Sequence, residues 1–134
     1  DSWTRPQGGY TPFYLDAISR LPPEADGHKL FTCEWQSGSY ILYARPKVRF
    51  VDLLDPALLW QKDHQRYLLR RDLAEGRLRD PERALREGFG ADYVMCADAL
   101  SAQLAGDPRH FQELPAAQPG NPLRVFRVLP EPLP

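Results

Sequence analysis

The sequence predicts an α/β fold of three layers, in which a short, mostly parallel sheet is flanked by helices. Short apolar runs bounded by turn residues, the pattern of buried strands, lie at Lys29 to Glu34, Lys47 to Asp52 and Ala91 to Ala97. Helical patterns separate these runs, and strands that alternate with helices favour parallel pairing. With 134 residues, 43% of them hydrophobic, the chain can bury roughly two thirds of its unfolded surface.

The domain is predicted to begin at residue 11. Residues 1–10 are polar and without periodicity, so they are interpreted as a linker or lead-in. Thr11-Pro12 then supplies a capping hydroxyl and a proline with a preset φ, which together predict a helix start. Pro22-Pro23 ends this helix. Its apolar positions follow helical spacing: Tyr14, Ala17, Ile18 and Leu21.

Three Asp-Pro pairs in the rest of the chain mark the start of a helix or a turn. At such a position the aspartate carboxylate can accept backbone N–H bonds, and proline lacks only an N–H that would have no partner there. Asp55-Pro56 is predicted to start the longest helix, which runs to about Ala74. Asp80-Pro81 is predicted to start a shorter helix that ends near Glu87, and Asp107-Pro108 to open a turn after Gly106. Gly76 and Gly88 would end the first two helices in the left-handed conformation.

The C-terminal part is predicted to form a hairpin at the edge of the sheet. Phe111 to Leu114 and Leu123 to Leu129 flank a loop rich in proline and glycine. The domain would then span 11–129, and residues 130–134 would be a tail. The link between the first two strands leaves two possibilities open, since Gly38 to Ala44 could be a further strand or a helical turn.

Composition argues against several classes of partner. The net charge is −1 and the pI about 6.3, so no overall positive field would attract nucleic acid. No apolar run approaches the roughly 20 residues that span a bilayer. Asp1 to Tyr10 lacks the basic start and apolar stretch of a signal peptide.

No catalytic, cofactor or metal motif is predicted. Gly88-Phe89-Gly90 precedes a strand, which favours a helix terminator over a dinucleotide loop. The three histidines, His28, His64 and His110, lack the spacing of metal ligands. Cys33 and Cys96 each lie in an apolar strand, where a buried thiol fits and where a disulfide is possible only if the strands are neighbours. Whether they pair stays open.

A candidate ligand site follows the first strand. In α/β sheets ligands bind outside the carboxyl ends of strands, and the polar segment after the first strand shares that edge with Asp52 at the end of the second. Trp35 could stack on a sugar or a base there. The alternative is that Trp35 packs at the edge of the core and that Asp55 only caps a helix. The candidate residues are Glu34, Trp35, Ser37, Gly38, Ser39 and Asp52.

A second candidate surface lies on the long predicted helix. Leu58, Leu69 and Leu73 form one apolar stripe, whereas Trp60 and Tyr67 lie on another face. Two apolar faces on one helix indicate contact with the sheet and with something else. We interpret Trp60 and Tyr67 as a possible interaction surface for a partner. The simpler alternative is that a neighbouring loop of the same chain covers this face.

The order of these features resembles the soluble C-terminal region of bacterial multi-pass membrane glycosyltransferases, the class of protein mannosyltransferases, oligosaccharyltransferases and aminoarabinose transferases. The resemblance is carried by Trp35-Gln36-Ser37-Gly38-Ser39-Tyr40, the strand ending at Asp52, Gly90-Ala91-Asp92-Tyr93-Val94 and the strand Arg124 to Val128. It departs after Asp52, where family members often have Asp-x-Arg and this chain has Leu53-Leu54.

The resemblance implies a non-catalytic extracytoplasmic domain, in the periplasm or on the outer face of the inner membrane. Its partner would be the membrane-embedded portion of the same parent chain, and it would help to position a lipid-linked sugar, a glycan or another partner. Two alternatives remain: a free-standing α/β domain that binds or converts a small ligand, and a protein-interaction module that uses Trp60 and Tyr67.

Overall fold

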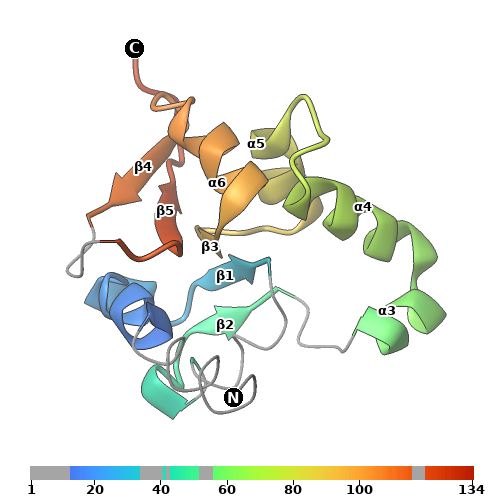
Figure 1. Cartoon of the computed structure of the whole chain (residues 1–134), viewed down its shortest axis with the longest axis horizontal. Helices are drawn as coiled ribbons and strands as arrows, with labels where there is room; N and C mark the ends of the chain where they lie inside the picture. The colour runs from blue at the N-terminus through green and yellow to red at the C-terminus, as the bar shows by residue number, and fades with distance from the viewer. Residues whose placement is uncertain (1–12, 34–40, 42, 52–55, 116–119) are drawn as a thin grey trace.

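The fold centres on a five-stranded mixed sheet with the strand order β2-β1-β3-β5-β4 (Figure 1). The structure is a computed structural model that describes residues 13–33, 41, 43–51, 56–115 and 120–134. β1 pairs in parallel with β2 and β3, whereas β5 pairs antiparallel with β3 and β4. The predicted α/β fold, its parallel strands and its C-terminal hairpin are therefore confirmed. The strands are β1 (Lys29–Thr32), β2 (Arg49–Phe50), β3 (Tyr93–Cys96), β4 (Phe111–Leu114) and β5 (Arg124–Val128).

Helices connect these strands. Residues 13–19 are helical, as their apolar spacing predicts, and residues 41, 43 and 44 are helical too, so this link contains a helical turn. The remaining elements are a 3-10 turn η1 (Pro23–Ala25), α3 (Pro56–Lys62), α4 (His64–Ala74), α5 (Pro81–Arg83), a π-helical turn η2 (Ala84–Gly88) and α6 (Asp98–Ala105).

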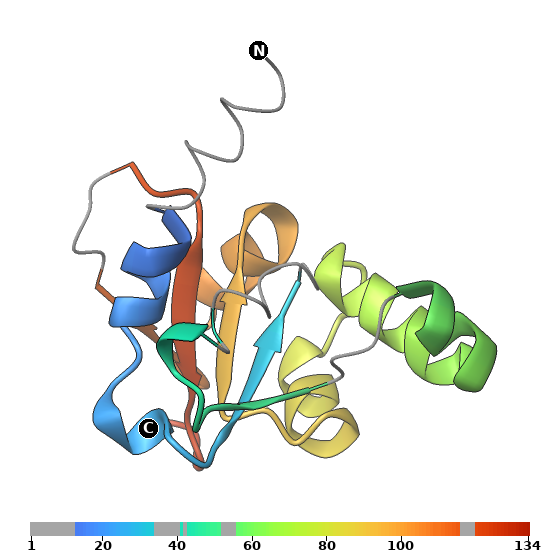
Figure 2. The ribbon, with the colours of Figure 1, turned by 90° about the horizontal axis from the view of Figure 1, so that it is seen from below.

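The sheet separates two hydrophobic clusters, because successive strand residues point to opposite faces. Phe31 and Val94 pack with side chains of α4, η2 and α6 on one face. Leu30 and Met95, their neighbours in sequence, pack with the helix 13–19 and with η1 on the other. The three predicted layers are present. Figure 2 shows the helix 13–19 and α4 on opposite sides of the molecule, with α3 and α4 projecting away from the sheet.

The long helix predicted from Pro56 to Ala74 is wrong in one respect, since it is broken into α3 and α4 at Asp63. Asp63 has extended backbone (φ −153°, ψ 90°), and its carboxylate accepts the backbone N–H of Arg66 at 3.0 Å. An aspartate that bonds to the third following amide is a helix cap rather than an interior helical residue. The break turns α3 away from the axis of α4.

The predicted caps are confirmed at two places and corrected at a third. Asp80 caps α5 by accepting the N–H of Arg83, and Gly76 ends α4 with φ 72°. After α5, however, the left-handed residue is Gly90 (φ 62°) and not Gly88. The π-helical turn widens the helix end, and it allows Phe89 to bury its ring 5.3 Å from that of Phe31.

A buried ion pair fastens the helix 13–19 to the strand segment before β5. Arg20 donates to the Asp16 carboxylate at 2.6 Å, and the two side chains are only 3% and 7% exposed. Arg20 also donates to the carbonyl of Leu123, and Asn121 donates to Asp16 at 2.8 Å. These contacts join residues more than 100 positions apart in the chain.

Candidate functional site

A disulfide joins the carboxyl ends of the two central parallel strands. Cys33 directly follows β1 and Cys96 ends β3, and their Cα atoms are 5.1 Å apart. The N–H of Cys33 donates to the carbonyl of Met95 at 3.3 Å, so the strand pairing itself brings the two cysteines together. The question that the sequence left open, whether these cysteines pair, is answered by the adjacency of β1 and β3.

A shallow depression of about 370 Å³ lies beside the disulfide, at the edge where ligands of α/β sheets usually bind. Asp98 stands at its rim with φ 58°, the one positive φ outside glycine among the described residues. Such a backbone conformation is costly for a residue with a side chain and is often retained near functional sites. The lining residues are Cys33, Ala74, Glu75, Ala97, Asp98 and Ala99.

The two strands that precede the predicted ligand residues end at this same edge of the sheet. β1 and β2 are adjacent and parallel, with the N–H of Val51 bonded to the carbonyl of Leu30 at 3.1 Å. Because the two strands run in parallel, they end on the same side of the sheet. The candidates themselves lie outside the described residues, and a ligand site there stays a prediction: Glu34, Trp35, Ser37, Gly38, Ser39 and Asp52.

Trp60 and Tyr67 form a small aromatic cluster where α3 meets α4. Their ring centroids are 5.2 Å apart in an edge-to-face arrangement, and the Trp60 ring lies 4.0 Å from that of His64. Trp60 is 42% exposed, whereas Tyr67 is half-buried. The structure thus brings the two predicted residues together, and their role in binding a partner remains a prediction.

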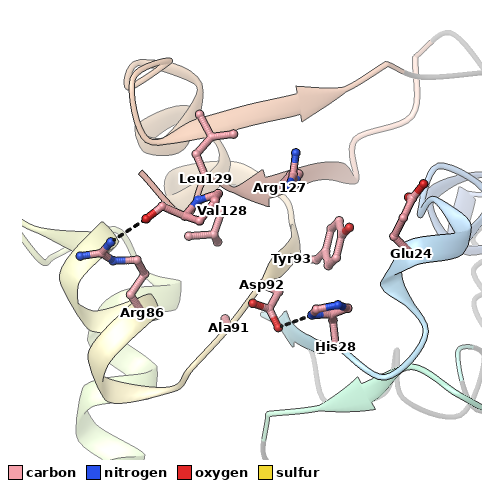
Figure 3. Close-up of a pocket in the computed structure, with 10 residues that line it drawn as sticks. Glu24, His28, Arg86, Ala91, Asp92, Tyr93, Arg127, Val128 and Leu129 are labelled. Atoms are coloured by element: carbon pink, nitrogen blue, oxygen red, sulfur yellow. Dashed lines mark hydrogen bonds and ion pairs between the residues drawn. The ribbon is translucent and has the colours of Figure 1, made fainter. Parts of the chain in front are cut away.

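Another cleft, which the sequence analysis did not predict, lies at the opposite end of the sheet. We call it the amino-end cleft, since it lies where β1 and β3 begin and β5 ends (Figure 3). Its volume is about 250 Å³. The visible signal in the sequence was the pair Asp92-Tyr93, a polar start to an otherwise apolar strand. The lining residues are Glu24, His28, Arg86, Ala91, Asp92, Tyr93, Arg127, Val128, Leu129 and Pro130.

Hydrogen bonds fix the floor of the amino-end cleft. One carboxylate oxygen of Asp92, Oδ2, accepts the backbone N–H of Lys29 at 3.1 Å and lies 3.2 Å from Nδ1 of His28. This pairing ties the start of β1 to the start of β3. At the far wall Arg86 is held by Glu82 and by the carbonyl of Pro130.

Burial raises the pKa of the Tyr93 phenol above its usual value near 10, because the charged phenolate is poorly solvated there. The positive charge of Arg127 acts in the opposite direction, and the carboxylates of Glu24 and Asp92 add to the increase. Tyr93 therefore remains a neutral hydroxyl at any physiological pH, able both to donate and to accept a hydrogen bond.

The raised pKa predicts a loss of stability in alkali. A group whose pKa is higher in the folded state stabilises the fold fully below its unfolded pKa of about 10 and loses that contribution as the pH rises through the folded value. Urea unfolding between about pH 8 and 11.5 should show this decline, and Tyr93→Phe should flatten it. Tyr43→Phe is the control, because Tyr43 is 90% exposed. Parallel declines in the wild type and Tyr93→Phe would contradict this expectation.

Within the described ranges, no three His, Cys, Asp or Glu side chains gather closely enough to hold a metal ion. No helix within these ranges has the length and hydropathy needed to cross a bilayer.

The fold and its edges define an α/β domain with a mixed sheet, helices on both faces and a disulfide across the carboxyl ends of two parallel strands. The C-terminal globular domain of an oligosaccharyltransferase from Archaeoglobus fulgidus is similar, with a TM-score of 0.53 and 13% sequence identity. The alignment covers 90% of this chain and 96% of that domain. At this identity the similarity establishes a shared fold. The sequence matches no family model and no curated protein at a significant level.

Proposed function

We propose that this chain is the non-catalytic, extracytoplasmic domain of a membrane-bound glycosyltransferase-like protein. The observation that carries the proposal is the structural similarity to the Archaeoglobus domain, which extends over nearly the whole of both chains. That domain is described as the C-terminal globular part of an oligosaccharyltransferase, an enzyme of the class that the sequence pattern resembles. The resemblance in sequence rests on the order of short motifs along the chain, whereas the structural similarity rests on the arrangement of the backbone in space.

The disulfide supports the proposed location. Disulfides persist in oxidising compartments and are rare where thiol reductants are abundant. The Cys33–Cys96 bond lies between neighbouring strands and closes a sequence separation of 63 residues, so it is part of the fold and not a peripheral link. A domain on the outer face of the inner membrane or in the periplasm would form this bond during folding.

In the proposed role, the domain positions a lipid-linked or polymeric substrate, or a partner, over a catalytic site in the membrane-embedded portion of the parent chain. The edge at which the parallel strands β1, β2 and β3 end, which we call the carboxyl-end edge, would serve this role, because the depression beside Cys33 and Asp98 opens there. The strands β1 and β2, which precede the predicted residues Glu34 to Ser39 and Asp52, end at the same edge. The rival function, a free-standing ligand-binding domain, would use the same edge without a membrane portion.

The sequence of the parent gene distinguishes these two functions. We expect several apolar spans of roughly 20 residues each to precede Asp1 in the parent chain. Thiol labelling of intact cells is the matching biochemical test, in which Cys33 and Cys96 should react with a maleimide only after reduction. A parent gene without apolar spans, or cysteines that are free in the cell, would overturn the proposal.

A further inference from the structure

We propose that the amino-end cleft binds a neutral polyol, the chemical class of a single sugar unit. The cleft lies at the opposite end of the sheet from the edge discussed above, and nothing in the fold similarity assigns it a ligand. Its biological role, contact with a glycan at a second point, rests on the proposed function. The binding itself does not, because it is argued from the side chains of the cleft alone.

The cleft presents two oppositely charged groups that pair with no described residue. Within the described part of the chain, the guanidinium of Arg127 and the carboxylate of Glu24 take part in no hydrogen bond or ion pair. Figure 3 shows them on either side of Tyr93, one from β5 and the other from η1. Side chains that line a concavity and have no internal partner can be satisfied by water or by a ligand.

Tyr93 and Asp92 supply two further polar groups to the cleft. The Tyr93 side chain is buried, and among the described residues no group bonds to its hydroxyl. Asp92 uses Oδ2 for both of its interactions, with His28 and with the N–H of Lys29, which leaves Oδ1 as a further acceptor. The cleft is thus lined by two hydrogen-bond acceptors, one donor and one hydroxyl. These are the carboxylate of Glu24 and Oδ1 of Asp92, the guanidinium of Arg127 and the phenol of Tyr93.

The charge pattern decides the class of ligand. Arg86 is paired with Glu82 and Asp92 lies beside His28, so the charges of Arg127 and Glu24 are left to balance each other around the cleft. An anionic ligand would lie beside two carboxylates and a cationic ligand beside two guanidinium groups, so either would meet repulsion as well as attraction. A hydroxyl group donates one hydrogen bond and accepts two, and neighbouring hydroxyls can therefore accept from Arg127 and donate to Glu24.

The size of the cleft limits the ligand further. At about 250 Å³ it lies below the roughly 300–1,000 Å³ of pockets that bury drug-sized ligands. Its lining includes Val128, Leu129 and Pro130, whose apolar atoms suit the C–H face of a sugar ring. One sugar unit fits these limits, with the rest of a chain extending outside.

The test is an NMR titration of the ¹⁵N-labelled chain with glucose, mannose and N-acetylglucosamine, with glucuronate, glucosamine and inorganic phosphate as charged probes. We expect at least one neutral sugar to shift the amide resonances of Asp92, Tyr93 and Arg127, with a Kd in the millimolar range typical of so small a ligand. Arg127→Gln and Glu24→Ala should each weaken binding about tenfold, the effect of losing one charge-assisted hydrogen bond.

Arg79→Gln is the matched control, because Arg79 is exposed and lies outside the cleft; it should leave the affinity unchanged. Tyr93→Phe keeps the ring, so it tests the hydroxyl without opening a cavity. Stronger binding of phosphate, glucuronate or glucosamine than of every neutral sugar would overturn the inference. So would equal affinities in wild type and Arg127→Gln, or no shift with any sugar. Each result is independent of whether the parent chain carries membrane spans.

Discussion

Replacing Cys33 and Cys96 together by alanine is expected to lower the free energy of unfolding by about 4 kcal/mol, the chain-entropy value for a closed loop of 63 residues. The bond joins β1 to β3 at the centre of the sheet, so its loss allows the unfolded chain many more conformations. The melting temperature should fall by more than roughly 10 °C. Urea unfolding measures the change in free energy and thermal unfolding the change in melting temperature, both followed by circular dichroism.

The controls separate the covalent bond from the packing of the sulfur atoms. Reduction of the wild-type chain breaks the bond and keeps both side chains, so it should reproduce most of the destabilisation. Cys33→Ala also breaks the bond, and it changes only the half-buried cysteine while the buried Cys96 stays in place. The free energy of unfolding of this single variant should therefore be close to that of the reduced wild type. Equal unfolding free energies for the oxidised and reduced chains would show that the disulfide does not stabilise the fold.

The second large effect is expected at the buried ion pair of the helix 13–19. Arg20→Met should cost about 3–5 kcal/mol, because it removes the cation while the Asp16 carboxylate stays buried. The substitution also removes the hydrogen bond to the carbonyl of Leu123, which attaches this helix to the segment before β5. Chemical denaturation of both proteins under the same conditions gives the difference in unfolding free energy.

A double variant shows whether the cost comes from the charge left behind. Asp16→Leu combined with Arg20→Met replaces both charges by apolar groups of similar length, and such replacements are often neutral. The double variant should therefore be more stable than Arg20→Met alone. A double variant that is less stable than Arg20→Met would mean that the Asp16 carboxylate stabilises the fold chiefly through its hydrogen bond from Asn121, since the bond to Leu123 is absent from both variants.

The strands and caps could be predicted from the sequence because their signals are local. Short apolar runs bounded by turn residues located β1, β3 and β5, and Asp80-Pro81 located the start of α5. The break at Asp63 was missed, because a charged residue inside a helical pattern carries the same signal whether it faces solvent or caps a new helix. Gly88 was given the role of Gly90, because the pattern does not show where a π-helical turn inserts.

The candidate sites show a different limit of sequence reasoning. The carboxyl-end edge could be located from strand direction alone, since the rule for α/β sheets needs only the ends of the strands. The amino-end cleft could not, because it is assembled from η1, η2, the residue before β1 and the two strands β3 and β5, whose order is set by long-range pairing. Glu24 and Arg127 are more than 100 positions apart, and neither has a local pattern that relates it to the other.

The Cys33–Cys96 bond also sets how the domain carries mechanical load. A pull applied at its two ends passes from Cys33 to Cys96 through the two sulfur atoms, so the chain between the cysteines, which includes β2 and β3, bears no tension. The fully stretched chain is shortened by about 200 Å as a result. α3, α4 and the turns that follow would keep their structure while the flanking strands separate, and an oxidised domain would hold its carboxyl-end edge together under a force that opens the rest of the sheet.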